Sequence, residues 1–427
     1  MTHQRLRILV SAFACSPFRG SEPGIGWNVV TRLANYHDVT VLVGDLRKDL
    51  LCKRELDEWL ASNGPKPGLT FCHVGPDRAI LIWERLHRLP GLWPLYYRAY
   101  GIWQKRALHL ARSMHANRRF DAVHELTYQS ARTPGYLWKL GVPFFWGPIS
   151  GAPVIPPAFY GMFGWSGSFR PLSRDLLNRV QLKLGGSVAR IARRARRVFV
   201  ATPEDELHAR SRWYICPELL PASGSDPTIH GSLHRREPGR PVRIVWSGRM
   251  VARKALPLLL NALARLPVQS DWTLAVLGDG PMRIDWQKKA KRLGLSAERI
   301  RWHGRLDLAQ AKTEMSRCDL LVHTALTEGT PNVVLEGLSF GLPVICHDVC
   351  GMSLVVTDDC GIKVPLVSPD LSISGFGCAI RSFLDKPGLL AQFSESALLR
   401  SKELTWDSIA MRISEAYTNA AEELQSR

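Results

Sequence analysis

Two glutamates, Glu328 and Glu336, flank a predicted strand-to-helix turn, where carboxylates can bind the hydroxyl groups of a ligand. The apolar run 318–324 predicts a buried parallel strand, and Glu328 belongs to the turn that follows it. Thr330 is a good helix cap and Pro331 suits the first helical position, so we expect a helix to begin here. Glu328 then lies in the loop and Glu336 in the second helical turn.

The start of this predicted helix is also suited to an anion. A helix start has about four free backbone amides, and here one fewer because Pro331 has no N–H. Such amides attract phosphates, while carboxylates accept hydrogen bonds from sugar hydroxyls. The combination indicates a ligand with phosphates and many hydroxyls. The simpler alternative is a surface loop with one Glu and an ordinary amphipathic helix with another, a spacing that is common by chance.

An earlier strand-and-helix unit supplies cations. Val242–Trp246 predicts a strand, and Gly248, Arg249 and Lys254 follow it before a helix from Ala255 to Leu266. Glycine lets the backbone come close to a ligand, and cations at the end of a strand suit a diphosphate. Because cations oppose the dipole at a helix start, a bound anion explains them better than a surface pair does.

Glu328, seven intervening residues and Glu336 resemble the E-x7-E signature of the family 4 retaining glycosyltransferases. Gly248-Arg249 with Lys254 is similar to the phosphate-binding element of that family. The resemblance covers nearly the whole chain and implies an α/β protein of GT-B fold. In this fold two Rossmann-like doubly wound domains face each other across a cleft.

The resemblance also implies roles for individual residues. Glu328 would lie at the donor sugar, and Glu336 would hold the ribose of the nucleotide. Arg249 and Lys254 would stabilise the charge on the departing diphosphate, so the expected catalytic residues are Glu328, Arg249 and Lys254. The expected donor-binding residues are Gly248, Arg305, Gly329, Thr330, Asn332, Val333 and Glu336. This scheme requires no metal or other cofactor, and the sequence has no Asp-x-Asp motif.

The acceptor side is expected near the N-terminus. Arg7–Phe13 predicts the first strand, and residues 20–26 predict a glycine loop before a helix from Trp27 to about Tyr36. The loop is similar to the N-terminal glycine loop of the family, which approaches the donor phosphates and the acceptor. The expected acceptor-side residues in it are Glu22, Gly24 and Gly26. A tight turn with no further role is the alternative.

Many members of this family carry a histidine near the acceptor, and this chain departs from that pattern. The predicted strand at 142–147 runs into Trp146-Gly147-Pro148 instead. His124, at the end of the preceding predicted strand, is the nearest candidate for the acceptor side. The alternative is that His124 is a hydrogen-bonded core residue.

Composition limits the other possibilities. A chain of 427 residues favours two or three domains. The 56 Lys and Arg against 38 Asp and Glu leave a net charge of +18, which indicates an anionic partner. The nine cysteines form no paired CxxC sites and are expected to be reduced. With no apolar run that could span a bilayer and no signal segment before the first strand, we expect a cytoplasmic protein.

Basic and aromatic residues alternate between Arg78 and Met114, and a second basic block occupies residues 190–197. Aromatic residues with Lys and Arg on a helix are typical of attachment to an anionic membrane surface. Solvated helix faces over buried aromatic residues are the alternative. For either block alone this alternative is slightly preferred, but two such blocks in one half of the chain favour peripheral attachment to the inner face of the membrane.

The predicted organisation has four parts. They are an N-terminal acceptor-side domain (1–222), a linker (223–240), a nucleotide-sugar-binding domain (241–402) and a closing helix (403–427) that crosses back to the first domain. The predicted function is transfer of a hexose, with retention, from a nucleotide-diphosphate sugar to a glycan or lipid-linked acceptor in surface polysaccharide or glycolipid synthesis. One alternative is a nucleotide-sugar epimerase on the same fold. The other is a nucleic-acid-binding protein, which only the charge suggests and in which the paired glutamates have no role.

Overall fold

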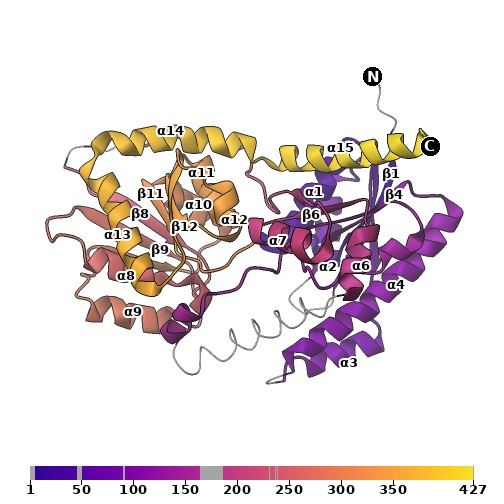
Figure 1. Cartoon of the computed structure of the whole chain (residues 1–427), viewed down its shortest axis with the longest axis horizontal. Helices are drawn as coiled ribbons and strands as arrows, with labels where there is room; N and C mark the ends of the chain where they lie inside the picture. The colour runs from indigo at the N-terminus through magenta and orange to yellow at the C-terminus, as the bar shows by residue number, and fades with distance from the viewer. Residues whose placement is uncertain are drawn as a thin grey trace.

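Two parallel β-sheets, each covered by helices, lie side by side along the long axis of the molecule (Figure 1). The computed structural model describes residues 5–45, 51–89, 92–163, 186–229, 231–235, 237 and 239–426. Residues 1–4, where no signal segment is expected, and residues 230, 236 and 238 of the predicted linker lie outside these ranges. The first sheet has the order β3-β2-β1-β4-β5-β6-β7, and the second has the order β10-β9-β8-β11-β12-β13.

The first sheet belongs to the N-terminal half of the chain. Its strands are β1 (Arg7–Ala12), β2 (Asp38–Gly44), β3 (Leu69–Val74), β4 (Ala122–Thr127), β5 (Phe144–Ile149), β6 (Arg197–Val200) and β7 (Glu218–Leu219). Its α-helices are α1 (Ser21–Leu33), α2 (Cys52–Asn63), α3 (Arg78–Leu86), α4 (Tyr96–Asn117), α6 (Gly186–Arg194) and α7 (Pro203–His208). Short helical turns are η1 (Trp93–Leu95), η2 (Leu137–Leu140), η3 (Pro157–Phe163) and η4 (Ala209–Trp213). The strands are apolar runs because helices bury both faces of a parallel sheet.

The second sheet has the same design. Its strands are β8 (Val242–Ser247), β9 (Trp272–Leu277), β10 (Ile300–Gly304), β11 (Leu320–His323), β12 (Val344–His347) and β13 (Gly361–Val364). Its helices are η5 (Ala252–Lys254), α8 (Leu256–Ala264), α9 (Arg283–Arg292), α10 (Leu308–Ser316), α11 (Asn332–Ser339), α12 (Cys350–Val355), α13 (Pro369–Asp385) and α14 (Pro387–Glu403). In both sheets the chain order reverses between neighbouring strands, and ligands of such sheets bind at the carboxyl ends of the strands.

The prediction of a glycine loop at residues 20–26 is wrong, because α1 already begins at Ser21. A Cβ atom at Gly24 would lie 2.4 Å from the carbonyl oxygen of Arg19, and one at Gly26 would lie 2.3 Å from that of Ala14. These glycines therefore let a helix pack directly against the chain that precedes it. They do not mark a flexible turn.

The last helix, α15 (Trp406–Gln425), lies across the first sheet, whereas α14 lies beside the second (Figure 1). His124 on β4 connects this helix to the sheet. Its Nε2 lies 2.7 Å from the carbonyl oxygen of Gly147 and must donate to it, so Nδ1 accepts from the hydroxyl of Tyr417 on α15. Burial lowers the pKa of His124 to about 4, which keeps the ring neutral.

Two of the aromatic residues of α4 face inward. Tyr100 and Trp103 are buried in the core between α4 and the first sheet, while Arg98 and Arg112 on the same helix are exposed. The arrangement agrees with the alternative of buried aromatic residues beneath a solvated basic face. No helix in the described part of the chain is long and apolar enough to cross a membrane.

Candidate active site

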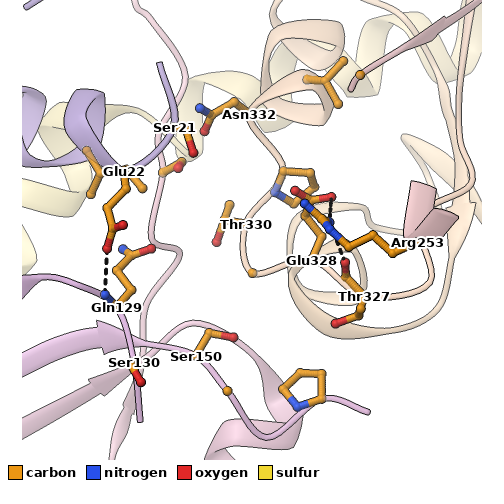
Figure 2. A pocket seen from close by; sticks show the side chains of 18 of the residues that line it. Ser21, Glu22, Gln129, Ser130, Ser150, Arg253, Thr327, Glu328, Thr330 and Asn332 are labelled. Atoms are coloured by element: carbon orange, nitrogen blue, oxygen red, sulfur yellow. Dashed lines mark hydrogen bonds and ion pairs between the residues drawn. The ribbon is translucent and has the colours of Figure 1, made fainter. Parts of the chain in front are cut away.

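A cavity of about 640 Å³ lies between the two halves of the molecule and is lined by residues of both. The first half contributes the start of α1, the segment after β4 and the end of β5. The second half contributes the turn after β8 and the loop from β11 to α11. Figure 2 shows Glu22, Gln129, Ser130 and Ser150 on one side, facing Thr327, Glu328, Thr330 and Arg253 on the other.

Three charged side chains form a cluster on the second-half wall of the cavity. The Nζ atom of Lys254 donates to Oε2 of Glu328, and Nη1 of Arg253 lies 3.1 Å from the same oxygen. Arg253 also donates to the carbonyl oxygen of Thr327, at 3.1 Å. The cluster joins the turn after β8 to the loop after β11.

Backbone contacts hold these two loops in register. The hydroxyl of Thr324 donates to the carbonyl oxygen of Lys254 at 2.7 Å, and the amide of Leu326 donates to that of Arg253 at 2.9 Å. The indole of Trp246 on β8 donates in turn to the hydroxyl of Thr324 at 3.0 Å. These contacts therefore fix the backbone positions from which the charged side chains extend, without the help of a ligand.

The electrostatics of the cluster keep it charged. Burial favours the neutral form of Glu328, but Lys254 and Arg253 outweigh that effect and lower its pKa to about 2. Burial lowers the pKa of the Lys254 ammonium, and the charge of Glu328 opposes this effect. Glu328 is thus an ionised carboxylate at neutral pH that compensates the buried Lys254 and the half-buried Arg253. An anionic ligand placed among them would interact strongly, because buried charges are weakly screened.

Most of the expected donor-binding residues line the cavity. They are Gly248, Gly329, Thr330, Asn332 and Val333, and the expected acceptor-side residue Glu22 lines the opposite wall. The start of α11 differs by one residue from the prediction, since Pro331 caps the helix without a side-chain bond. The hydroxyl of Thr330 instead accepts from the backbone amide of Ala222, at 2.9 Å, and so connects the two halves of the chain.

Glu336 is not among the residues that line the cavity. It lies one turn beyond Asn332 on α11, and Lys312 on α10 is the charged side chain that acts on it. Burial raises the pKa of Glu336 to about 7, and the charge of Lys312 acts against this. Within the residues that the structure describes, no side chain pairs with its carboxylate. Arg249 and Arg305 are exposed and are not among the cavity-lining residues.

Three expected acceptor-side residues are not among those that line the cavity. Gly24 and Gly26 are inside α1, where they allow close packing. His124 is fully buried beneath α15, so the expectation that it reaches the acceptor is wrong and the alternative of a hydrogen-bonded core histidine is right.

The structure adds residues that the sequence reasoning missed. Arg253 contacts Glu328, and its only signal in the sequence is its position next to Lys254 in a turn with several cations. Asp205 on α7 is buried and accepts from the amides of Gly151 and Ala152, at 2.9 Å and 2.8 Å. This contact holds the segment that begins at Ser150, which forms part of the first-half wall. No local pattern marks Asp205, because its partners lie about fifty residues earlier.

Residues 241–385 match the model of a known family, described as Glycosyl transferases group 1. This segment is a group 1 glycosyl transferase domain. The domain carries the whole charged cluster, including Lys254 and Glu328. The resemblance drawn from the E-x7-E spacing is thereby confirmed at the level of the family.

Two relatives of the group 1 domain are named for lipopolysaccharide synthesis. The lipopolysaccharide core biosynthesis glycosyltransferase LpsE of Rhizobium meliloti is 37% identical over 153 residues, which is 36% of this chain and 42% of the relative. The lipopolysaccharide glucosyltransferase WaaG of Escherichia coli is 32% identical over 120 residues, 27% of this chain and 31% of the relative. Each match thus spans less than half of the relative.

Solved structures match over nearly the whole chain. The lipopolysaccharide outer core galactosyltransferase WaaB superposes with a TM-score of 0.64 at 14% identity, over 96% of this chain and 98% of that one. Anabaena HepE, solved with UDP and glucose, has a TM-score of 0.59 at 15% identity, over 99% and 100% of the two chains. At such identities the likeness establishes the fold, and the predicted GT-B fold is confirmed.

We predict that Gly351→Ala displaces the loop that carries Glu328. The amide of Gly351 approaches the carbonyl oxygen of Glu328 at 3.3 Å, and an added Cβ atom would lie 1.6 Å from the carbonyl oxygen of Gly329. Relief of this overlap should cost about 1 to 3 kcal/mol and lower the melting temperature. Gly388→Ala on α14 is the control, because nothing lies within 4 Å of its added Cβ atom. Equal melting temperatures for the two variants would contradict the packing described here.

Proposed function

We propose that this protein is a retaining glycosyltransferase that moves a hexose from a nucleotide-diphosphate sugar to a glycan or lipid-linked acceptor. The observation that carries the proposal is the cluster of Lys254, Arg253 and Glu328 at the start of α11, inside a cavity between two GT-B domains. The names of the relatives support a role in surface polysaccharide or glycolipid synthesis. HepE, which has the same fold, was solved with UDP and with UDP-glucose, which supports a nucleotide-sugar donor.

The cluster suits the charge changes of sugar transfer. As the bond between the anomeric carbon and the diphosphate breaks, negative charge grows on the departing oxygen. Lys254, Arg253 and the amides near Asn332 would stabilise that charge without reorganisation, since the fold already fixes them. The acceptor hydroxyl bonds to the anomeric carbon and releases its proton toward the departing diphosphate. Glu328, ionised at neutral pH, would lie beside the sugar, where positive charge develops.

We propose a separate role for each domain that the sequence predicts. Residues 1–222 would hold the acceptor, residues 241–402 the donor, and residues 403–427 would connect the two domains. The donor scheme uses no metal. Within the described residues no group of three or more His, Cys, Asp or Glu side chains is placed to hold one. Neither the epimerase nor the nucleic-acid alternative gains support from the relatives described above.

The proposal is tested first by screening nucleotide sugars for thermal stabilisation, because a ligand that binds only the folded state raises the melting temperature. Transfer from the selected donor is then assayed with and without oligosaccharide acceptors. An epimerase would convert the donor alone. A chain that no nucleotide or nucleotide sugar stabilises would refute the proposed function.

We predict that Lys254→Ala and Arg253→Ala each lower kcat by about 100-fold or more and weaken donor binding much less. The reason is that the charge they contact grows in the transition state. Arg249→Ala, expected from the sequence to act in the same way, tests whether this exposed arginine also reaches the donor. Exposed Lys291 on α9 provides the control, and Lys291→Ala should keep full activity. Unchanged kcat in Lys254→Ala would remove the phosphate assignment.

We predict different effects for the two glutamates. Glu336→Gln should weaken binding of the free nucleoside about tenfold, because it loses the charge-assisted hydrogen bond to the ribose that the family resemblance implies. Glu328→Gln should leave nucleoside binding unchanged and lower transfer. The ionised carboxylate of Glu336 accepts hydrogen bonds better than the protonated acid does, and its pKa is about 7. The affinity of the natural protein for the nucleoside should therefore rise as the pH rises through that value. Calorimetry should show no such rise in Glu336→Gln, and equal losses in both variants would contradict the division of roles.

The outer face of the first domain is suited to an anionic membrane surface. The patch formed by Leu81, Ile82, Arg85, Leu89 and Leu92 is exposed on α3 and the turns after it. The second basic block overlaps α6, which packs in the same core cluster as α3 and α4, so the helical parts of both blocks lie on one face of the sheet. Figure 1 shows α3, α4 and α6 together at one end of the first domain. We propose peripheral attachment of this face to the inner side of the membrane, next to a lipid-linked acceptor.

We predict that the protein sediments with anionic vesicles at low salt and is released at high salt, since each surface cation contributes about 1 kcal/mol of attraction. The double variant Arg85→Gln, Arg190→Gln should bind less, because both side chains are exposed on this face. The matched control is Arg292→Gln, Arg301→Gln, two exposed arginines of the second domain. No sedimentation of the natural protein at low salt would favour a solvated face and a soluble acceptor.

A further inference from the structure

We propose that the first-domain wall of the cavity binds an acceptor with an anionic group, a phosphate or a carboxylate, next to the accepting sugar, and that Arg132 binds this group. The proposal rests on the proposed function, because it assigns the chemical class of the acceptor in the same cavity.

Among the described residues that line the cavity, Arg132 is the cation without a counter-charge. Arg253 and Lys254 both pair with Glu328. The guanidinium of Arg132, in contrast, pairs with no carboxylate and donates no hydrogen bond within the described residues, and its Nε atom is buried without a partner. Burial of an unpaired donor of a charged group is unfavourable, so native structures rarely keep one without a ligand or water to satisfy it. An anion in the cavity would satisfy it.

The nearby carboxylates are engaged elsewhere. Asp205, which holds the neighbouring segment, accepts from Gly151, Ala152 and the hydroxyl of Thr202. Glu22 accepts from the amide of Gln129 at 2.9 Å. Both carboxylates therefore have other partners, and neither pairs with Arg132 within the described residues.

The segment that carries Arg132 is well ordered by its own contacts. The amide of Arg132 donates to the hydroxyl of Ser130 at 3.3 Å, and a parallel bridge pairs Ser130 with Ser150. The amide of Ala131 donates to the carbonyl oxygen of Ser150 at 3.2 Å. A Cβ atom at Gly151 would lie 4.0 Å from Nη2 of Arg132, which places the guanidinium next to this bare backbone. The arginine is thus held at the wall before the acceptor binds.

Two tyrosines on the same wall suit the ring of a sugar. Tyr97 and Tyr128 line the cavity, with ring centroids 6.2 Å apart and planes at 79°. Tyr128 has a φ of +66°, a conformation that bulky residues rarely adopt and that occurs preferentially at ligand sites. Aromatic faces pack against the C–H face of a sugar, while Ser130 and Ser150 offer hydroxyl partners. An arginine next to such a surface matches a sugar that also carries a negative charge.

The position of Arg132 favours the acceptor over the donor diphosphate. Arg132 follows β4 in the first domain, two residues after Ser130. Figure 2 shows Ser130 and Gln129 across the open space from Glu328 and Arg253, the residues assigned to the donor. The cavity therefore has two separate cationic positions, one on each wall. The second position is expected to bind the anion of the acceptor.

The test measures sugar binding to the full chain saturated with the nucleoside diphosphate that the donor screen selects, so that the donor site is occupied. The probes are glucose 6-phosphate, methyl glucuronide and methyl glucoside. At least one charged probe should bind about tenfold more tightly than the neutral one, the difference expected for a charge-assisted hydrogen bond. The tighter charged probe identifies the group as phosphate or carboxylate.

Arg132→Gln should abolish this preference and leave nucleoside diphosphate affinity unchanged. Arg132→Lys, which keeps the charge and loses the planar fork, should retain part of it. Arg112→Gln, at an exposed position on α4, is the matched control and should behave like the natural protein. Melting temperatures of all variants check that they are folded.

Three results would overturn the proposal. They are equal or undetectable binding of charged and neutral sugars, a charge preference that survives in Arg132→Gln, and a loss of nucleoside diphosphate affinity in Arg132→Gln as large as the loss of sugar affinity. The last result would assign Arg132 to the donor. Failure of the proposed function would look different, because the natural protein would then bind no nucleotide. The sugar comparison can still be made on the nucleotide-free protein.

Discussion

The ion cluster of Glu328 with Lys254 and Arg253 is the interaction on which the candidate site depends. Buried charges are tolerated only when they are paired and hydrogen-bonded, and here one carboxylate compensates two cations from a different loop. The same pairing fixes the turn after β8 against the loop before α11. A diphosphate would give the cations a second negative partner, so the cluster both stabilises the unliganded site and prepares it for an anion.

The cavity itself is a product of the whole GT-B arrangement. A Cβ atom at Gly329 would lie 3.8 Å from that of Ser150, so the two walls nearly touch at this point. Two polar contacts join the halves there, from Ala222 to Thr330 and from the amide of Cys350 to Glu204, at 2.9 Å each. Because α15 packs on the first sheet, the C-terminus of the chain also helps to hold the domains in place. Donor and acceptor positions are therefore set by contacts far from either ligand.

Much of the fold could be predicted from local patterns. Strand β8 (Val242–Ser247), for example, differs by one residue from the predicted bounds Val242–Trp246, because a largely apolar run between turn residues has few other stable conformations. The start of α1 could not be predicted from local patterns. Its glycines are needed because backbone atoms of Ala14 and Arg19 lie close to them, and only the folded chain brings these atoms near. Local sequence patterns indicate a preference for a secondary structure, but close packing in the folded chain can override that preference.

The sequence by itself determined which chemical groups the site has available: two glutamates at a helix start, a glycine-and-cation turn, and an excess of positive charge. The tertiary structure alone decided which of them face one another. It brought Arg253 to Glu328 while Arg249 stayed exposed, and it buried His124 beneath Tyr417. It left Arg132 at the cavity without an acidic partner among the described residues. The physical reason is that the direction of a side chain at a strand end depends on loop course and on packing between segments distant in sequence, and neither can be read from the spacing of residues.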